Sequence, residues 1–128
     1  MRQTDRVADP KRTHRRVLEF ALALPGAYED HPWEETVVKV NKKIFVFLGS
    51  EDSPTWPAIT VKLRTSHAGA LGVPGAEPTG YGLGKSGWVT VALAIAKAPP
   101  LGVLTDWVEE SYRLIAPKKL VAELDAGG

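Results

Sequence analysis

The chain has 128 residues, a length that suits one domain built around one core. Hydrophobic residues make up 44% of it and charged residues 24%, which is ordinary for a globular protein in water. The absence of cysteine excludes disulfides, thiolate zinc sites, iron–sulfur clusters and cysteine nucleophiles. A net charge of +1 gives no support for nucleic-acid binding through bulk charge, so the distribution of the charges matters more than their sum.

Neither a membrane span nor an export signal is predicted. The longest nearly apolar run, Trp88–Ala96, is far shorter than the ~20 residues that cross a bilayer. The first six residues lack the apolar segment of a secretory signal. We therefore expect a cytoplasmic protein with no membrane partner, a single domain over residues 1–128 and an ordered core over about 9–124. A monomer is slightly favoured over an oligomer.

A first helix is predicted from the Asp9-Pro10 pair, because aspartate before proline is a good helix start. Val17, Ala21 and Leu24 recur at helical spacing, and Pro25-Gly26 ends the pattern. Four cations occupy the first turns, where the helix dipole disfavours positive charge, and this is a weak hint that they serve a partner. They are Lys11, Arg12, Arg15 and Arg16.

Strands are predicted from residue 36 onward, after a loop over 27–35. Thr36–Val40 and Ile44–Leu48 read as strands, joined by a turn at Asn41-Lys42-Lys43. Ala58–Arg64 follows as the clearest strand, because apolar and polar residues alternate along it. Such alternation is typical of an antiparallel sheet with one wet face.

The C-terminal half predicts one more strand and two helices. Trp88–Ile95 is the strand, after one helical turn at Ser66–Leu71 and a loop rich in glycine and proline. A helix over about Thr105–Ala116 has an apolar stripe and stops at Pro117, and Lys118–Leu124 forms a shorter helix. The order of helix, strands and helix predicts an α+β two-layer sandwich.

Enzyme chemistry finds little support, and we expect no catalytic residues, no cofactor and no metal site. Gly84-Lys85-Ser86 resembles the end of a phosphate-binding loop, but Thr79 stands where that pattern needs glycine. None of the histidines has a partner at metal-ligand spacing. Glu29, Asp30 and His31 lie together and could bind a cation or move protons, but a loop whose carboxylates cap backbone N–H groups or face water explains them better.

The wet side of the sheet is the more informative surface. It carries Lys62, Arg64, Trp88 and Thr90, and further cations lie near it on the first hairpin and before the last strand. Cations contact phosphates and an exposed aromatic ring stacks on a base, so these residues could bind nucleic acid. Lysines also protect sheet edges from pairing with other chains, which explains most of the same residues.

Five stretches, in order, resemble one family. Leu24–Trp33 is similar to its "PG…E-x-x-P-[FW]" signature, and Val38–Phe45 to its "(F/V)KV-x-x-K-(I/M)F" hairpin. Val61–Leu63 resembles its "v-x-lK" strand, Tyr81–Val91 its "Y-x-l-x-k-x-x-W-v-x-v" segment and Glu110–Leu114 its "SY-x-l" helix. The chain is identified by these motifs as a member of the MmcQ/YjbR family, with the resemblance spanning roughly residues 13–124.

The resemblance implies a CyaY-like (frataxin-like) fold, in which an antiparallel sheet is covered on one face by the N- and C-terminal helices. It also implies a DNA-binding "double wing" protein whose β-hairpins act as wings. The family's usual glycine in the first hairpin is replaced by Asn41-Lys42, and the residue before the tryptophan, often histidine, is Gly87.

We therefore expect a DNA-binding protein of low sequence specificity. The predicted DNA-binding residues are Lys39, Lys42, Lys43, Lys62, Arg64, Lys85, Ser86 and Trp88. The alternative is a protein-interaction or metal-handling module on the same scaffold, because carboxylates bind hard cations. Its surface would be acidic, formed by Glu19, Glu29, Asp30, Glu34 and Glu35.

Overall fold

The computed structural model describes residues 9–80 and 82–127. In these ranges the α-helices are α1 (Pro10–Leu22), α2 (His67–Leu71), α3 (Leu101–Ile115) and α4 (Lys118–Gly127). The strands are β1 (Tyr28–Asp30), β2 (Thr36–Val40), β3 (Lys43–Gly49), β4 (Ala58–Lys62), β5 (Ala76–Pro78) and β6 (Trp88–Ala92). Two short 3-10 helices complete the description: η1 (Pro32–Glu34) and η2 (Leu83–Ser86).

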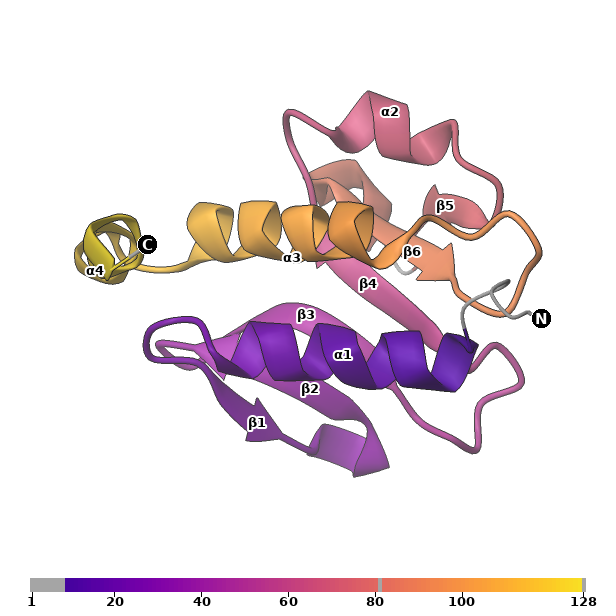
Figure 1. Ribbon diagram of the computed structural model, residues 1–128, viewed down its shortest axis with the longest axis horizontal. Helices are drawn as coiled ribbons and strands as arrows, with labels where there is room; N and C mark the ends of the chain where they lie inside the picture. The colour runs from indigo at the N-terminus through magenta and orange to yellow at the C-terminus, as the bar shows by residue number, and fades with distance from the viewer. Residues whose placement is uncertain (1–8, 81, 128) are drawn as a thin grey trace, which may run out of the picture.

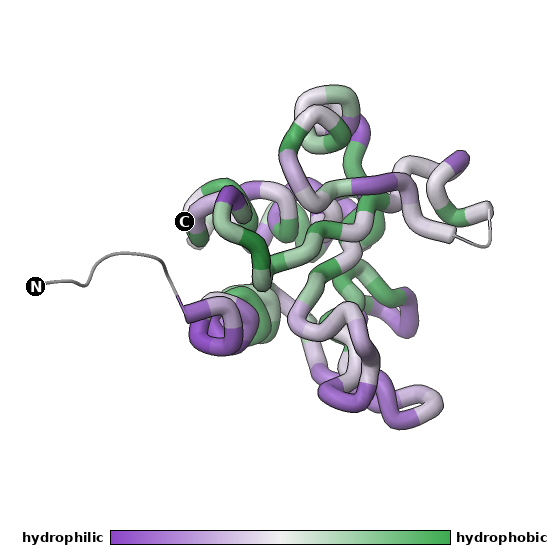
Figure 2. The backbone as a smooth tube through the Cα atoms, turned by 90° about the vertical axis from the view of Figure 1, so that its right-hand side faces the viewer, coloured by the Kyte–Doolittle hydropathy of each residue, from purple (hydrophilic) through white to green (hydrophobic). Residues whose placement is uncertain are grey.

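The described strands form one antiparallel sheet in the order β1-β2-β3-β4-β6-β5. Helices α1 and α3 pack against each other and against one face of this sheet (Figure 1). In the view from the side, the two helices lie on one side of the sheet, and the β5–β6 connection, which contains η2, extends from the other side, which no described α-helix covers (Figure 2). The predicted α+β sandwich, with N- and C-terminal helices on one face, is confirmed.

Helix α1 begins where the sequence predicts. The Asp9 carboxylate accepts a hydrogen bond from the backbone N–H of Lys11 at 3.0 Å, and Pro10 occupies the first turn. Val17 and Ala21, one turn apart, are fully buried against the sheet. The helix ends before Gly26, whose φ of +74° turns the chain toward β1.

Helix α3 begins at Leu101, four residues before the predicted start at Thr105. The prediction was wrong because it sought a hydroxyl or carboxylate cap, whereas Pro100 itself stands at the N-cap in extended geometry. Thr105 lies inside the helix, and its hydroxyl donates to the Gly102 carbonyl at 3.1 Å.

Several strand boundaries also differ from the prediction. β4 ends at Lys62 and β6 at Ala92, because the chain beyond each strand leaves the ladder. The Arg64 N–H donates to the Glu110 carboxylate at 2.7 Å instead of to a neighbouring strand. β1 and β5 fall within segments predicted as loops, because a strand of three residues is too short to show an alternating pattern.

The core lies between the helices and the sheet, where apolar segments gather in Figure 2. Irregular pairing between β2 and β3 lets two neighbours, Phe45 and Val46, both bury completely. Phe45 packs edge-on against Tyr112 of α3, with ring centroids 5.3 Å apart. None of the described helices is long and apolar enough to cross a membrane.

Candidate nucleic-acid interface

Two hairpins and the end of β4 meet at one end of the sheet. Strand register fixes this arrangement: Val40 pairs with Lys43 at the β2–β3 turn, and Lys62 at the end of β4 pairs with Trp88 at the start of β6. The β5–β6 connection, which contains η2, therefore emerges beside Lys62. We call this region the basic end. It contains Lys42, Lys43, Lys62, Arg64, Lys85 and Ser86.

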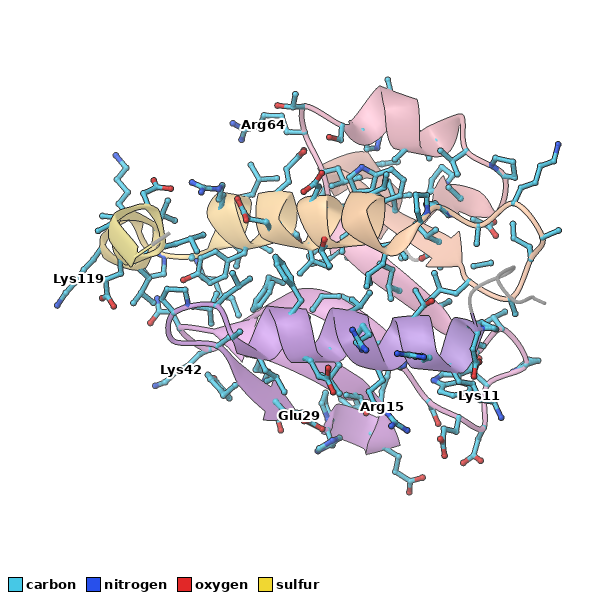
Figure 3. All side chains as sticks on the ribbon, in the orientation of Figure 1. Lys11, Arg15, Glu29, Lys42, Arg64 and Lys119 are labelled. Carbon is cyan, nitrogen blue, oxygen red and sulfur yellow. The ribbon has the colours of Figure 1, made fainter. Side chains whose placement is uncertain are left out.

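The β2–β3 turn presents Lys42 to solvent in a strained backbone conformation. Asn41 and Lys42 have φ values of 51° and 68°, the pair of positive angles that defines a type I′ hairpin turn. Asparagine tolerates this conformation, but for lysine it costs about 1–2 kcal/mol relative to an ordinary helical or extended residue. Lys42 projects away from the molecule in Figure 3. The turn therefore displays a cation at a position that glycine would occupy more easily.

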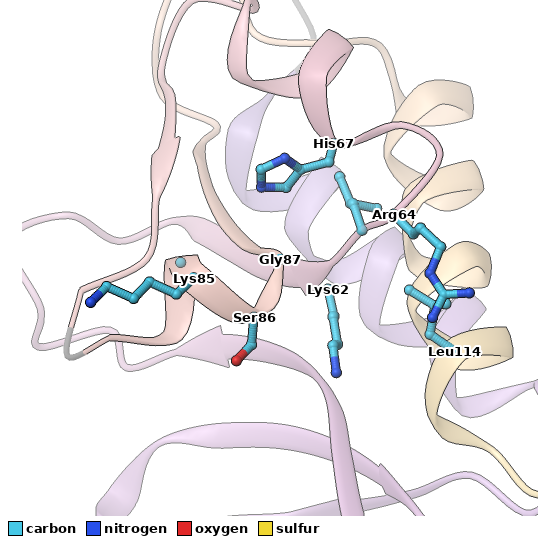
Figure 4. Close-up of a pocket in the computed structure, with 9 residues that line it drawn as sticks. Lys62, Arg64, His67, Lys85, Ser86, Gly87 and Leu114 are labelled. Carbon is cyan, nitrogen blue, oxygen red and sulfur yellow. The ribbon is translucent and has the colours of Figure 1, made fainter.

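A hollow of about 540 Å³ lies between the end of β4 and η2 (Figure 4). Three cations line it, namely Lys62, Arg64 and Lys85, and none of the described residues around it is a carboxylate. None of the three forms an ion pair with a described carboxylate. Their side chains diverge, with Lys85 extending away from Lys62 and Arg64 in Figure 4. Such spacing suits an extended anion better than one small one.

Helix α3 holds the β4 end of this hollow in place through Glu110 and Ser111. The Glu110 carboxylate accepts hydrogen bonds from the Arg64 N–H at 2.7 Å and the Ser66 N–H at 3.1 Å. Partial burial favours the protonated form of Glu110, but these hydrogen bonds outweigh it and lower the pKa of the carboxyl. The Ser111 hydroxyl accepts from the Lys62 N–H at 2.9 Å and donates to the Phe45 carbonyl at 2.5 Å.

Two of the sequence motifs meet in the fold. The Tyr112 hydroxyl donates to the Pro25 carbonyl at 2.6 Å, which joins the "SY" helix to the "PG" turn after α1. Together with the bonds of Glu110 and Ser111, this contact shows that the "SY" motif fastens α3 to the sheet and its loops. Tyr81, which opens another of the motifs, lies outside the described residues.

Lys39 differs from the other predicted cations because a carboxylate already balances its charge. Its ammonium lies 2.7 Å from the Asp30 carboxylate on β1. The hydrogen bond between them lowers the pKa of Asp30 and raises the pKa of Lys39. Lys39 thus has less charge to offer an anion than the cations around the hollow, and its place in the site stays a prediction.

Trp88 is half-buried on the face of the sheet that lacks helices. Its ring lies edge-on to Phe47, with centroids 5.3 Å apart and an interplanar angle of 74°. Because Trp88 and Lys62 are register partners, their side chains leave the same face of the sheet side by side. The structure thus places one aromatic ring directly next to the basic end.

Helix α4 brings Lys118 and Lys119 to the same end, which the sequence did not predict. Leu120 lies against Gly26, and Val40 of the β2–β3 hairpin is close to the same point. Lys119 and Lys42 both extend toward the left in Figure 3. A Lys-Lys pair after a proline was visible in the sequence, but nothing local indicated which element it would lie beside. Lys11 and Arg15 lie toward the N-terminal end of α1, away from Lys42 and Lys119 in Figure 3.

The acidic residues on the β1 side form local pairs. The Nε2 atom of His31 lies 2.7 Å from a carboxylate oxygen of Glu29, and the Asp30 carboxylate forms an ion pair with the Lys39 ammonium. Across residues 9–80 and 82–127, no group of three or more histidine, aspartate and glutamate side chains is placed to hold a metal ion.

An antiparallel sheet roofed by helices on one face, with cations gathered where its hairpins end, defines an α+β sandwich with one basic end. The chain belongs to the YjbR family, whose sequence model matches residues 22–114. This span covers all six described strands, α2 and nearly all of α3. Among curated proteins, no match to the chain is found.

Proposed function

We propose that this protein binds DNA with little sequence specificity and that the basic end contacts the phosphate backbone. The observation that carries the proposal is the hollow lined by Lys62, Arg64 and Lys85 without any described carboxylate. Cations left unbalanced at one place attract a polyanion even when the net charge of the whole chain is only +1.

Low specificity follows from the kind of groups present. Backbone contacts position a protein on DNA, whereas base-edge contacts specify the sequence. Gly87, just before Trp88, has a φ of +97°, and a Cβ there would lie 2.6 Å from the Leu63 carbonyl oxygen. No side chain can therefore read a base from this position of the β5–β6 hairpin.

A salt titration of binding to fluorescently labelled DNA tests the proposal. With roughly five phosphate contacts, the logarithm of the binding constant should fall with the logarithm of salt concentration with a slope of about −4 to −5. Absence of binding at low salt, or binding indifferent to salt, would contradict it.

A triple variant locates the contact. Replacing Lys62, Arg64 and Lys85 with alanine should make the slope shallower by about 3, because each phosphate contact contributes nearly one unit. Lys97→Ala is the matched control, since this exposed lysine follows the opposite end of β6. Circular dichroism of both variants checks that the fold is retained.

A protein-interaction role is a second candidate because of Trp33. Its side chain is 97% exposed, and Trp33 and Glu34 both have positive φ, at 52° and 67°. A strained turn that holds an indole in water is typical of a contact made with a partner. Affinity capture should retain a binding protein with the wild type and lose it with Trp33→Ala; identical capture by both would remove this candidate.

A further inference from the structure

We infer that the helix-free face of the sheet gives this protein a preference for single-stranded over duplex DNA. The inference rests on the proposed function, and it assigns a task to side chains that phosphate binding leaves unused. These residues lie next to the basic end, on β3, β4 and β6 and directly after β5.

Hydroxyls and aromatic rings, rather than charges, occupy the centre of this face. The Thr90 hydroxyl lies 2.9 Å from that of Thr60 and 3.0 Å from that of Thr79, which forms a chain of three hydrogen-bonded threonines. Phe47 pairs with Thr60 across the strands, and its ring contacts Trp88. All five side chains are half-buried, so each keeps part of its surface open to a ligand.

Phe47 and the three threonines line a hollow of about 330 Å³, between the chain that follows β3 and η2. Trp88 does not line this hollow, but its ring contacts Phe47, which does. Ser53, Thr55 and Leu83 contribute to its walls, and no described cation lines it. The single carboxylate at its rim, Glu35, would repel a phosphate but can accept a hydrogen bond from the amino group of a base. The lining therefore suits an uncharged flat group with polar edges, as a nucleobase is.

The two hollows lie on either side of η2, because Leu83 lines the second hollow and the next residue, Gly84, lines the basic one, and their chemistry is complementary. Lys62 lines the basic hollow, and its register partner Trp88 stands beside it on the helix-free face. In Figure 4, Lys62 and Ser86 extend to the same side of the chain. A strand whose phosphates lie along the cations can thus place its neighbouring bases over Trp88, Phe47 and the threonines.

Only an unpaired strand can make this second contact. The bases of a duplex are stacked on one another and paired, so their faces are not available to a protein side chain. In a single strand the bases are free to stack on aromatic rings, and this contribution depends little on sequence. Duplex DNA would retain the phosphate contacts alone.

The direct test compares the wild-type affinity for a short labelled oligonucleotide with its affinity for the blunt duplex of the same sequence at one salt concentration. We expect the single strand to bind about tenfold more tightly, as one stacked base provides. Equal or tighter binding of the duplex would overturn the inference while leaving the proposed function intact. Failure of both to bind at low salt would overturn the proposed function and this inference together.

Trp88→Leu should then weaken single-strand binding by about tenfold and leave duplex binding unchanged. Trp33→Leu is the matched control, because Trp33 is fully exposed elsewhere and should change neither affinity. Thr60→Val keeps the shape of its side chain and removes one hydroxyl of the hollow, so it supplies the same comparison if Trp88→Leu does not fold. An equal loss for both DNA forms in these variants would contradict the assignment of this face.

Discussion

Ser111 joins three elements through one hydroxyl group, although its side chain is among the smallest in the core. It is fully buried, and it bonds both the Lys62 N–H of β4 and the Phe45 carbonyl of β3. Ser111→Ala should lower the free energy of unfolding by about 1–3 kcal/mol, because two buried backbone groups lose their partner. Urea denaturation measures the change. Ser86→Ala, at an exposed serine, is the control and should change it by less than about 0.5 kcal/mol; equal effects would refute the bridging role.

His14 makes stability depend on pH near neutrality. Its Nε2–H donates to the Leu48 carbonyl at 2.6 Å, and its ring packs edge-on against Trp56. Burial lowers the pKa of His14, although the bond to Leu48 and the charge of Glu51 act in the opposite direction. Because the folded-state pKa is the lower one, the stabilisation is present above about pH 6.5 and is lost as pH falls through the folded pKa.

Melting temperatures measured between roughly pH 8 and pH 5.5 check this expectation. The wild type should lose stability on acidification, and His14→Asn should show a flatter profile, although it will be less stable throughout. Ser86→Ala serves as the comparison, since it changes an exposed side chain without a titratable group and should leave the profile of the wild type unaltered. A wild-type curve that stays level over this range would contradict the role of His14.

At the scale of elements, Lys42 in the β2–β3 turn has two opposite effects: its charge favours DNA binding, whereas its positive φ destabilises the fold. Lys42→Gly should raise the free energy of unfolding by roughly 0.5–1 kcal/mol, since glycine adopts positive φ without steric cost. The same change should weaken DNA binding and make the salt slope shallower by about one. Thermal melts and salt titrations measure the two effects.

Lys43→Gly is the matched control for that turn. It removes the same charge one residue later, but within strand β3, where glycine destabilises by roughly 0.5–1 kcal/mol. The two variants should therefore resemble each other in DNA binding and differ in the sign of the stability change. Stability changes of the same sign would show that strain at Lys42 is negligible.

The sequence predicted the elements whose signals are local. Asp9-Pro10 marked the start of α1, and alternating residues marked β4 within two residues of its end. The motifs that resemble the family predicted the one-sided arrangement of helices. The roles of Glu110 and Ser111 were not predictable, because their partners lie 44 to 66 residues away in the chain. The ion pair between Lys39 and Asp30 was not predicted either. Asp30 lies on β1, which the sequence predicted as loop, so nothing placed it beside Lys39 on β2.

For the whole molecule, the position of a charged side chain should affect DNA affinity more than the net charge of the chain does. Lys85→Glu and Lys97→Glu change the net charge from +1 to −1 alike, but only the first alters the basic end. Lys85→Glu should reduce DNA affinity about tenfold or more at low salt, and Lys97→Glu should have little effect. Anisotropy titrations of both variants compare them directly. Equal losses would mean that the overall charge, and not the basic end, governs attraction.

The margins of the sheet have a consequence for how separate copies behave in solution. Each outermost strand, β1 or β5, is only three residues long. β5 finishes on Pro78, which lacks an N–H, and β1 finishes on the charged Asp30. A strand of another molecule can therefore form very few backbone hydrogen bonds with either outermost strand. This protects the valine-rich inner strands from adding further copies edge to edge and growing into fibrous aggregates.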